Sequence, residues 1–156
     1  MTTFRRLLVP HDFSAPATNA LRVAAKLIGP RGRILVLHAI APYTPMTDIS
    51  PVVMNAYVPP QELIASAERH LERILRKELP ARLRSRVQAR VVMGDPYQRI
   101  IRAAKGMDAI VMSTAGRTGL AHILIGSVAE KVVRHSPIPV LTLRPEVVRR
   151  VARAQR

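Results

Sequence analysis

Five short apolar runs, separated by longer stretches of helical periodicity, set the pattern of the chain. The first, second and fourth runs are apolar almost without a break, which is typical of strands buried on both faces of a parallel sheet. The third run alternates at its start, which indicates a strand at the edge of the sheet. The predicted strands cover residues 5–10, 33–40, 87–93, 107–112 and 140–143.

Apolar residues between these runs recur at the spacing of amphipathic helices. Ser14 or Asp12 can cap the first helix, and the glycine- and proline-containing segment 29–32 is expected to end it. Asp95 can cap the third helix, with Pro96 as its first residue. The expected helices cover approximately residues 16–28, 61–79, 96–104 and 127–135.

The alternation of strands and helices predicts an α/β fold: a single doubly wound, open sheet of five parallel strands with helices on both faces. A chain of 156 residues with 48% hydrophobic residues can form one domain with a full core.

Two segments depart from the pattern of alternating strands and helices. Residues 41–60 contain five prolines and are expected to form a lid, a binding loop or a locally disordered segment. Residues 145–156 are expected to form a basic tail, as a frayed helical turn or a disordered end.

Small residues cluster directly after the fourth predicted strand, at 113–116, and again at Gly126 and Ser127. Small side chains let backbone N–H groups approach a bound anion, and a helix that begins there adds its positive dipole end. The Ser127 hydroxyl can cap that helix or contact a phosphate. Arg117 lies beside the same loop and can pair with a phosphate or stay solvated.

The spacing of these small residues resembles the nucleotide loop of the universal stress protein family, whose ATP-binding members carry Gly-x2-Gly-x9-Gly-Ser/Thr. Gly116 matches the second glycine, Gly126 and Ser127 match the end, and Ser113 replaces the first glycine. The serine is costly if that position needs a positive φ or a tight contact, and costs little if it needs neither. The resemblance covers nearly the whole chain and assigns residues 1–144 to one universal stress protein domain.

The resemblance also implies the strand order 3-2-1-4-5 of the adenine nucleotide alpha hydrolase-like fold. That order reverses between the first and fourth strands, and ligands bind at the carboxyl ends of strands that flank such a reversal. The implied ligand is ATP or ADP, with or without Mg²⁺. The implied contacts are Pro10, Asp12 and Ala39 at the adenosine, Met112 and Ser113 at the ribose, and Gly116, Gly126, Ser127 and Val128 at the phosphates.

Each implied contact also has a purely structural interpretation. Asp12 can serve only as a turn or cap residue, and the glycines can serve only in turns. Met112 and Val128 can be core residues that border the cavity. His11, at the mouth of the expected crevice, is a further candidate for a ligand contact, whereas His38 is expected to be packed.

No catalytic residue or protein-only metal site is expected. The chain has no cysteine, and its carboxylates form no evident acid–base pair. His70, His122 and His135 lie on three separate predicted elements, so a metal site built from them is not expected. The P-loop signature of fast ATPases is absent, so the sequence predicts at most slow ATP hydrolysis.

The formal charge of +15 suggests an anionic partner: nucleic acid, a membrane surface or a phosphorylated ligand. The densest cluster of arginines lies between Arg69 and Arg90, without the interleaved aromatic residues that single-strand binders use. Loose electrostatic association is therefore expected rather than specific nucleic-acid recognition. The N-terminus lacks the long apolar segment of a signal peptide, and no run approaches transmembrane length, so we expect a cytoplasmic protein without membrane insertion.

These observations predict a universal stress protein that binds ATP or ADP as a regulatory ligand in a stress response. One alternative, motivated by Ser113, is a dimeric interaction module of the same fold that binds no nucleotide. The other alternative is a basic, nucleic-acid-associated stress protein. A homodimer through Val140–Leu143 is expected because relatives often pair through the last strand and because this apolar strand would otherwise leave an open edge. The sequence does not identify a signalling partner.

Overall fold

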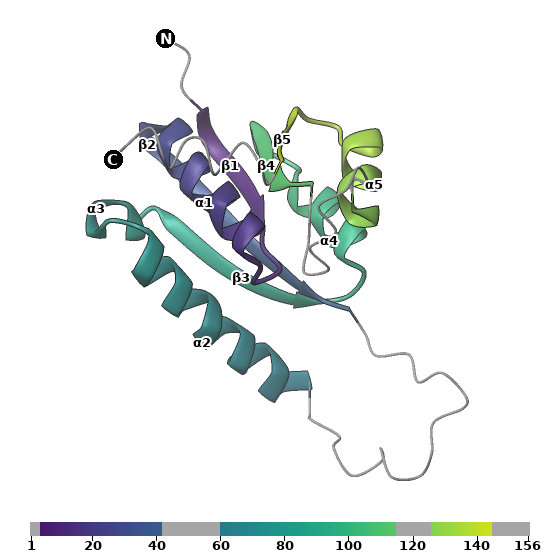
Figure 1. Ribbon diagram of the computed structural model, residues 1–156, viewed down its shortest axis with the longest axis horizontal. Helices are drawn as coiled ribbons and strands as arrows, with labels where there is room; N and C mark the ends of the chain where they lie inside the picture. The colour runs from purple at the N-terminus through teal and green to yellow at the C-terminus, as the bar shows by residue number, and fades with distance from the viewer. Residues whose placement is uncertain (1–3, 42–59, 115–125, 145–156) are drawn as a thin grey trace.

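A computed structural model describes residues 4–41, 60–114 and 126–144, which form a parallel sheet with helices on both faces (Figure 1). Along the chain the elements are β1 (Phe4–Pro10), α1 (Ala15–Leu27), β2 (Ile28–Ile40), α2 (Pro60–Glu78), α3 (Ala81–Arg84), β3 (Val87–Met93), α4 (Pro96–Ala103), β4 (Ala109–Ser113), α5 (Ser127–His135) and β5 (Val140–Leu143). Residues 42–59 of the loop expected at 41–60, and the tail expected at 145–156, lie outside the described residues.

The sheet has the order β3-β2-β1-β4-β5, and each neighbouring pair is parallel. The predicted order 3-2-1-4-5 and the predicted edge position of the third strand are therefore confirmed. β1 occupies the centre, and Leu7, Leu8 and Val9 are fully buried there because the strand is covered on both faces.

Two apolar layers hold the helices on the sheet, and successive strand residues contribute to opposite layers. Leu7 and Val9 pack in the layer that also contains buried residues of α1 and α2. Leu8 and Ile110 pack in the layer that also contains buried residues of α4 and α5. Among the described residues, no helix is long and apolar enough to cross a membrane.

Two of the expected helix caps are confirmed. The Ser14 side chain accepts a hydrogen bond from the Ala17 N–H at 3.2 Å, at the start of α1. The Asp95 carboxylate accepts one from the Gln98 N–H at 2.9 Å, at the start of α4. Both caps satisfy amide groups that the first helical turn leaves without a partner.

The predicted start of the second strand at residue 33 is wrong, because β2 begins at Ile28, directly after α1. The strand continues through the glycine- and proline-containing segment because Ile28 pairs with Phe4 across an irregular register. The guanidinium of Arg86 donates hydrogen bonds to the carbonyls of Gly29 and Pro30 at 2.9 and 2.7 Å, which satisfies backbone groups in this part of the strand. The short helix α3 was not expected from the sequence.

Candidate functional site

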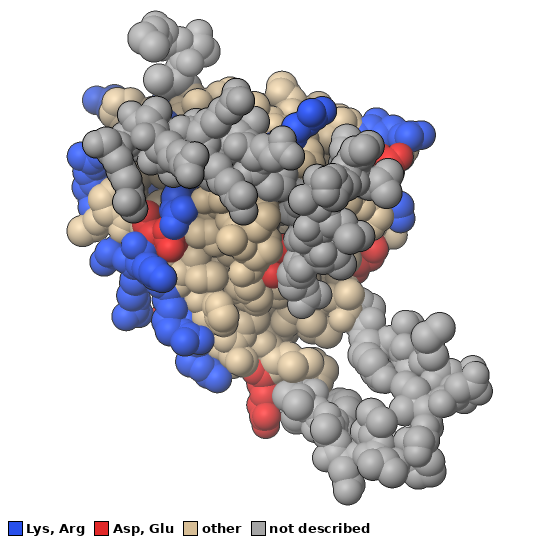
Figure 2. Space-filling view, viewed as in Figure 1, with Lys and Arg blue, Asp and Glu red and all other residues tan. Residues whose placement is uncertain are grey.

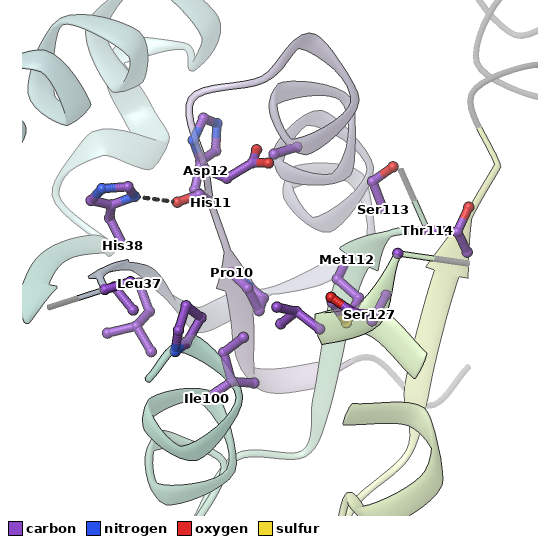
Figure 3. Close-up of a pocket in the computed structure, with 17 residues that line it drawn as sticks. Pro10, His11, Asp12, Leu37, His38, Ile100, Met112, Ser113, Thr114 and Ser127 are labelled. Carbon is purple, nitrogen blue, oxygen red and sulfur yellow. Dashed lines mark hydrogen bonds between the residues drawn. The ribbon is translucent and has the colours of Figure 1, made fainter. Parts of the chain in front are cut away.

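A cavity of about 330 Å³ lies at the carboxyl ends of β1, β2 and β4, on either side of the point where the strand order reverses (Figure 3). Eight of the ten residues proposed as ligand contacts line it, and the other two, Gly116 and Arg117, lie outside the described residues. The eight are Pro10, Asp12, Ala39, Met112, Ser113, Gly126, Ser127 and Val128.

The cavity has further walls that the sequence did not indicate. Leu37 from β2 and Ile100 from α4 contribute buried apolar side chains, and Pro96 brings the start of α4 to the same space. His38 and Thr114 add polar side chains next to predicted contacts. The periodicity of α4 indicates its inner face, but it does not indicate which strand ends that face will meet.

The turn from β1 into α1 carries the predicted adenosine contact Asp12. The Asp12 Oδ1 atom accepts a hydrogen bond from the Ser14 N–H at 3.0 Å, so one carboxylate oxygen shapes the turn. Oδ2 makes no hydrogen bond within the described residues. Asp12 therefore serves the turn, as its structural interpretation expects, and still offers an anionic oxygen to the cavity it lines.

The neighbouring Phe13 has a φ of 69°, the one positive φ of a described residue other than glycine. His11 Nδ1 accepts a hydrogen bond from the Phe13 N–H at 3.0 Å, which helps to hold this conformation. The Phe13 ring contacts the imidazoles of His38 and His70 in tilted arrangements, with centroid distances of 4.0 and 4.6 Å. The ring contacts and the hydrogen bond together offset the cost of the unusual backbone conformation.

His11 is buried, with 3% of its surface exposed. Because Nδ1 accepts a hydrogen bond, Nε2 carries the proton of the neutral ring and faces the Thr18 hydroxyl at 3.3 Å. Burial, the main cause, lowers the pKa of His11 from 6.5 to about 4, and His38 and His70 lower it further against the opposing effect of Asp12. The imidazole is thus neutral at pH 7, and it links the turn through Nδ1 to helix α1 through Nε2.

Ser113 occupies the place of the missing first glycine without backbone strain, because its φ is not positive. Its hydroxyl donates a hydrogen bond to the Leu143 carbonyl at 3.4 Å, and the Thr114 hydroxyl contacts the same oxygen at 3.3 Å. The Thr114 N–H donates to that carbonyl at 3.0 Å. The serine side chain is therefore accommodated by a contact with the end of β5.

We expect Ser113→Gly to change the affinity for an adenine nucleotide by less than about threefold, because the serine backbone already has an ordinary conformation. The free energy of unfolding should fall by about 0.5–1 kcal/mol, the usual cost of glycine in a strand. Urea unfolding and calorimetric titration with ATP measure the two effects. A gain in affinity of tenfold or more would instead mean that the serine obstructs the site.

The start of α5 forms the wall opposite the β1–α1 turn. Gly126 is the N-cap, with no side-chain cap, and its N–H donates to the Thr114 carbonyl at 2.8 Å. Ser127 is the first helical residue rather than the cap, so the interpretation of its hydroxyl as the helix cap is wrong. The first helical hydrogen bond runs from the Glu130 N–H to the Gly126 carbonyl at 2.9 Å. The N–H groups of the preceding residues lie at the positive end of the helix dipole, which favours an anion.

No group of three or more potential metal ligands from His, Cys, Asp and Glu occurs among the residues with described positions. Asp12 lines the cavity, and Asp95 and Glu130 each adjoin a lining residue in sequence. Asp95 caps α4, and Glu130 pairs with Arg134 at 3.0 Å. A divalent cation at this site would have to be held largely by the ligand's own phosphates and by water.

A scan against protein-family models matches residues 3–144 to the universal stress protein family. A universal stress protein of Thermus aquaticus is 32% identical over 147 residues, which cover 90% of this chain and 99% of the relative. A universal stress protein of Methanocaldococcus jannaschii is 28% identical over 155 residues, which cover 90% of this chain and 95% of the relative.

The solved structure of the M. jannaschii protein superimposes with a TM-score of 0.71 at 28% identity, and covers 91% of this chain and 96% of that structure. A universal stress protein solved in complex with cAMP superimposes with a TM-score of 0.62 at 20% identity, with 92% and 98% of the two chains covered. The adenine nucleotide alpha hydrolase-like fold is thus shared with these structures.

Proposed function

The chain belongs to the universal stress protein family, and from this premise we propose that it binds ATP or ADP as a regulatory ligand in the cavity at the carboxyl ends of β1, β2 and β4. The observation that carries the proposal is the pairing of two chemically different walls. Asp12 and small apolar residues form one wall, and the start of α5 forms the other.

The first wall suits an adenosine. Pro10 and Ala39 present small surfaces at the ends of two neighbouring strands. Asp12 Oδ2, which has no hydrogen bond to a described residue, can accept hydrogen bonds from N–H or O–H groups of the ligand. Leu37 and Ile100 extend this wall with apolar surface. A cavity with an apolar lining and a few fixed polar groups is the usual form of a small-ligand site.

The second wall suits phosphates. Gly126, Ser127 and Val128 bring the positive end of α5 and the serine hydroxyl to the cavity. The complex of a fold relative with cAMP, which is itself an adenine nucleotide, supports the same ligand class here. We propose that Gly116 and Arg117 complete this wall.

We propose binding rather than fast hydrolysis, because neither Asp12 nor His11 is available to activate a water at the phosphates. Asp12 accepts the Ser14 N–H through one oxygen, and the proposal assigns its other oxygen to the adenosine. Both nitrogens of His11 have partners, the Phe13 N–H in the β1–α1 turn and the Thr18 hydroxyl in α1. Neither group is therefore placed as a general base for an attacking water. Ligand binding would instead shift the population of states that contact a partner.

We also propose a homodimer through β5 in the cytoplasm. β5 is an outer strand of the sheet, and Leu141 on it is 41% exposed. Pairing with a second copy would cover this apolar side chain and the free strand edge. The dimeric interaction module without nucleotide is the alternative function, and the following experiment separates the two.

Asp12→Asn should lower the affinity for ATP and ADP about tenfold, because a hydrogen bond to a charged group contributes about 1.5–3 kcal/mol. The asparagine Oδ1 can still accept the Ser14 N–H, so the turn and the stability of the empty protein should be retained. Thermal unfolding over a concentration series of ATP, ADP and AMP measures the affinity for each nucleotide and the stability of the empty protein. A ligand at a hundred times its Kd stabilises the folded protein by about 2.7 kcal/mol. If none of the three nucleotides shifts the Tm of the parent protein, the interaction module is the better account.

A further inference from the structure

Basic residues concentrate on α2, α3 and the turn that follows them, away from the cavity. Residues 69–86 contain seven basic residues and two acidic ones, and they include part of the densest arginine cluster in the chain. Some of these basic side chains bind the protein backbone, and others point into solvent.

Two of these arginines bind the backbone. Arg84 donates a hydrogen bond from Nε to the Leu79 carbonyl at 3.0 Å, which secures the α2–α3 connection. Arg86 donates to carbonyls at the start of β2. Glu78, one of the two acidic residues, pairs with Arg22 of α1 at 2.6 Å and does not neutralise the outer face of α2.

The outer face of α2 carries basic residues that do not bind the backbone of the described residues. Arg69, Arg73 and Arg76 follow one another at spacings of four and three residues, so they share one face of the helix. The opposite face holds the buried residues Ala67 and Leu71, so the arginines point away from the sheet. Figure 2 shows Lys and Arg side chains gathered along the edge that α2 and α3 form.

A shallow hollow lies between these side chains, lined by Arg69, Glu72, Arg73 and Arg76. Glu72 pairs with Arg76 at 3.3 Å in an exposed contact, which is worth little and is readily exchanged for another anion. Arg69 and Arg73 have no ion pair or hydrogen bond with any described residue. The hollow therefore offers an anion two guanidinium groups without a partner and a third with a weak one.

We infer that the outer face of α2, the arginine face, binds duplex DNA through its phosphates and without sequence recognition. The row from Arg69 to Arg76 extends about 10 Å along the helix axis, and a duplex presents a phosphate charge about every 1.7 Å of its axis. A single protein surface of this length can thus meet several phosphates. The charge of +15 adds a long-range attraction that speeds the encounter.

Other partners fit this face less well. An anionic membrane surface would be met by basic side chains together with apolar ones that insert, but the middle of this face carries Arg69, Glu72, Arg73 and Arg76. A single strand would require aromatic side chains for stacking, and residues 60–86 contain no phenylalanine, tyrosine or tryptophan. A second copy of the chain would bring like-charged arginines against this face if it paired here, so this face does not suit self-association.

Fluorescence anisotropy of a labelled duplex of mixed sequence, titrated with the full chain at about 50 to 300 mM salt, where the Debye length falls from roughly 14 Å to roughly 6 Å, tests the inference. The logarithm of the binding constant should fall with the logarithm of the salt concentration with a slope of about −3 or steeper, as expected for three or more phosphate contacts. Arg69→Gln combined with Arg73→Gln should weaken binding at least tenfold at the lowest salt. The same change should make the slope shallower by about 2 units.

The matched control is Arg102→Gln combined with Lys105→Gln. It removes the same net charge from exposed positions on and just after α4, which packs on the other face of the sheet from α2. The inference requires this control to keep the parent slope. It also requires both double variants to keep the parent's Tm shift with ATP, since neither pair lines the cavity.

Three results would overturn the inference. The first is no binding to the duplex at the lowest salt. The second is an equal loss of binding in the two double variants, which would mean that net charge alone acts. The third is binding to phosphatidylserine vesicles or to single strands that exceeds binding to the duplex. A failed nucleotide titration with intact duplex binding would contradict only the proposed nucleotide function, so the two failures are distinguishable.

Discussion

Ser127→Asp should weaken ATP binding about a hundredfold while it slightly stabilises the empty protein. Ser127 is the exposed first residue of α5 and lines the cavity, so a carboxylate there would face the phosphates of a bound nucleotide. Two like charges at about 4 Å repel by about 1 kcal/mol in water and about 4 kcal/mol near a protein surface, and a hundredfold loss lies between these limits. The same carboxylate interacts favourably with the helix dipole, which should add about 0.3–1 kcal/mol to the free energy of unfolding.

The variant is informative because the ATP affinity should fall while the free energy of unfolding rises. A damaged fold would lower both the affinity and the free energy of unfolding. Ser127→Asn is the matched control, as it has the same shape as aspartate without the charge. Calorimetric titration should show the loss for ATP and ADP and little change for adenosine, which lacks phosphates. Equal losses for ATP and adenosine, or undiminished binding of ATP, would contradict the placement of phosphates at the start of α5.

Acidification from pH 7 to pH 4 should cost the protein up to about 3 kcal/mol of unfolding free energy through His11 alone. The folded protein holds the pKa of His11 at about 4, whereas the unfolded chain has the ordinary value of 6.5. Between these values the unfolded chain binds the extra proton, so protonation favours unfolding. The stabilising effect is complete above pH 6.5 and is lost as the pH falls toward 4.

His11→Asn should flatten this pH dependence, because asparagine does not titrate. Its Oδ1 atom can replace Nδ1 as the acceptor for the Phe13 N–H, so the turn keeps that contact. The difference between the slopes of the parent and of His11→Asn gives the contribution of His11. Urea unfolding at several pH values between 4.5 and 7 measures the slope, within the window set by the two pKa values of about 4 and 6.5. A parent protein equally stable across this range would contradict the account of a neutral, buried imidazole.

A second group with a lowered pKa acts outside that window. The backbone N–H groups of Arg6 and Arg5 donate hydrogen bonds to the Asp108 carboxylate at 2.8 and 2.7 Å and lower its pKa from 3.8. Its contribution to stability is present above pH 3.8 and is lost only at lower pH. Measurements above pH 4.5 (more than about half a unit above the ordinary aspartate value) therefore leave out most of the Asp108 contribution.

The apolar runs of the sequence were sufficient to predict the five strands, but not the start of β2. The segment from Gly29 to Gly32 has the composition of a turn, and local propensity predicts a break there. The structure keeps this segment extended because Arg86, distant in sequence, binds its carbonyls, and because Ile28 pairs with Phe4. Such long-range contacts leave no local pattern that could reveal them.

The candidate site also contains residues that could be predicted from the sequence and residues that could not. Asp12, Ala39 and Ser113, at or just after strand ends, were predictable from the family resemblance. The strand order that the resemblance implies gathers the carboxyl ends of these parallel strands on one edge. Pro96 and Ile100 were missed because the packing of α4 over that edge depends on side-chain fit rather than on periodicity. The effect of Ser113 could not be decided from sequence alone, since it depends on the backbone conformation and on the contact with Leu143.

A titration of isotope-labelled protein with ADP, followed by amide NMR spectra, tests the central claim most directly. We predict saturable shifts in the amides of Asp12, Ala39, Ser113, Gly126 and Val128, which come from three strand ends and one helix start and meet only at this cavity. The amides of the arginine face of α2 should stay unchanged at the same nucleotide concentrations. The absence of shifts at millimolar ADP, or shifts confined to α2, would contradict nucleotide binding at the reversal of the sheet.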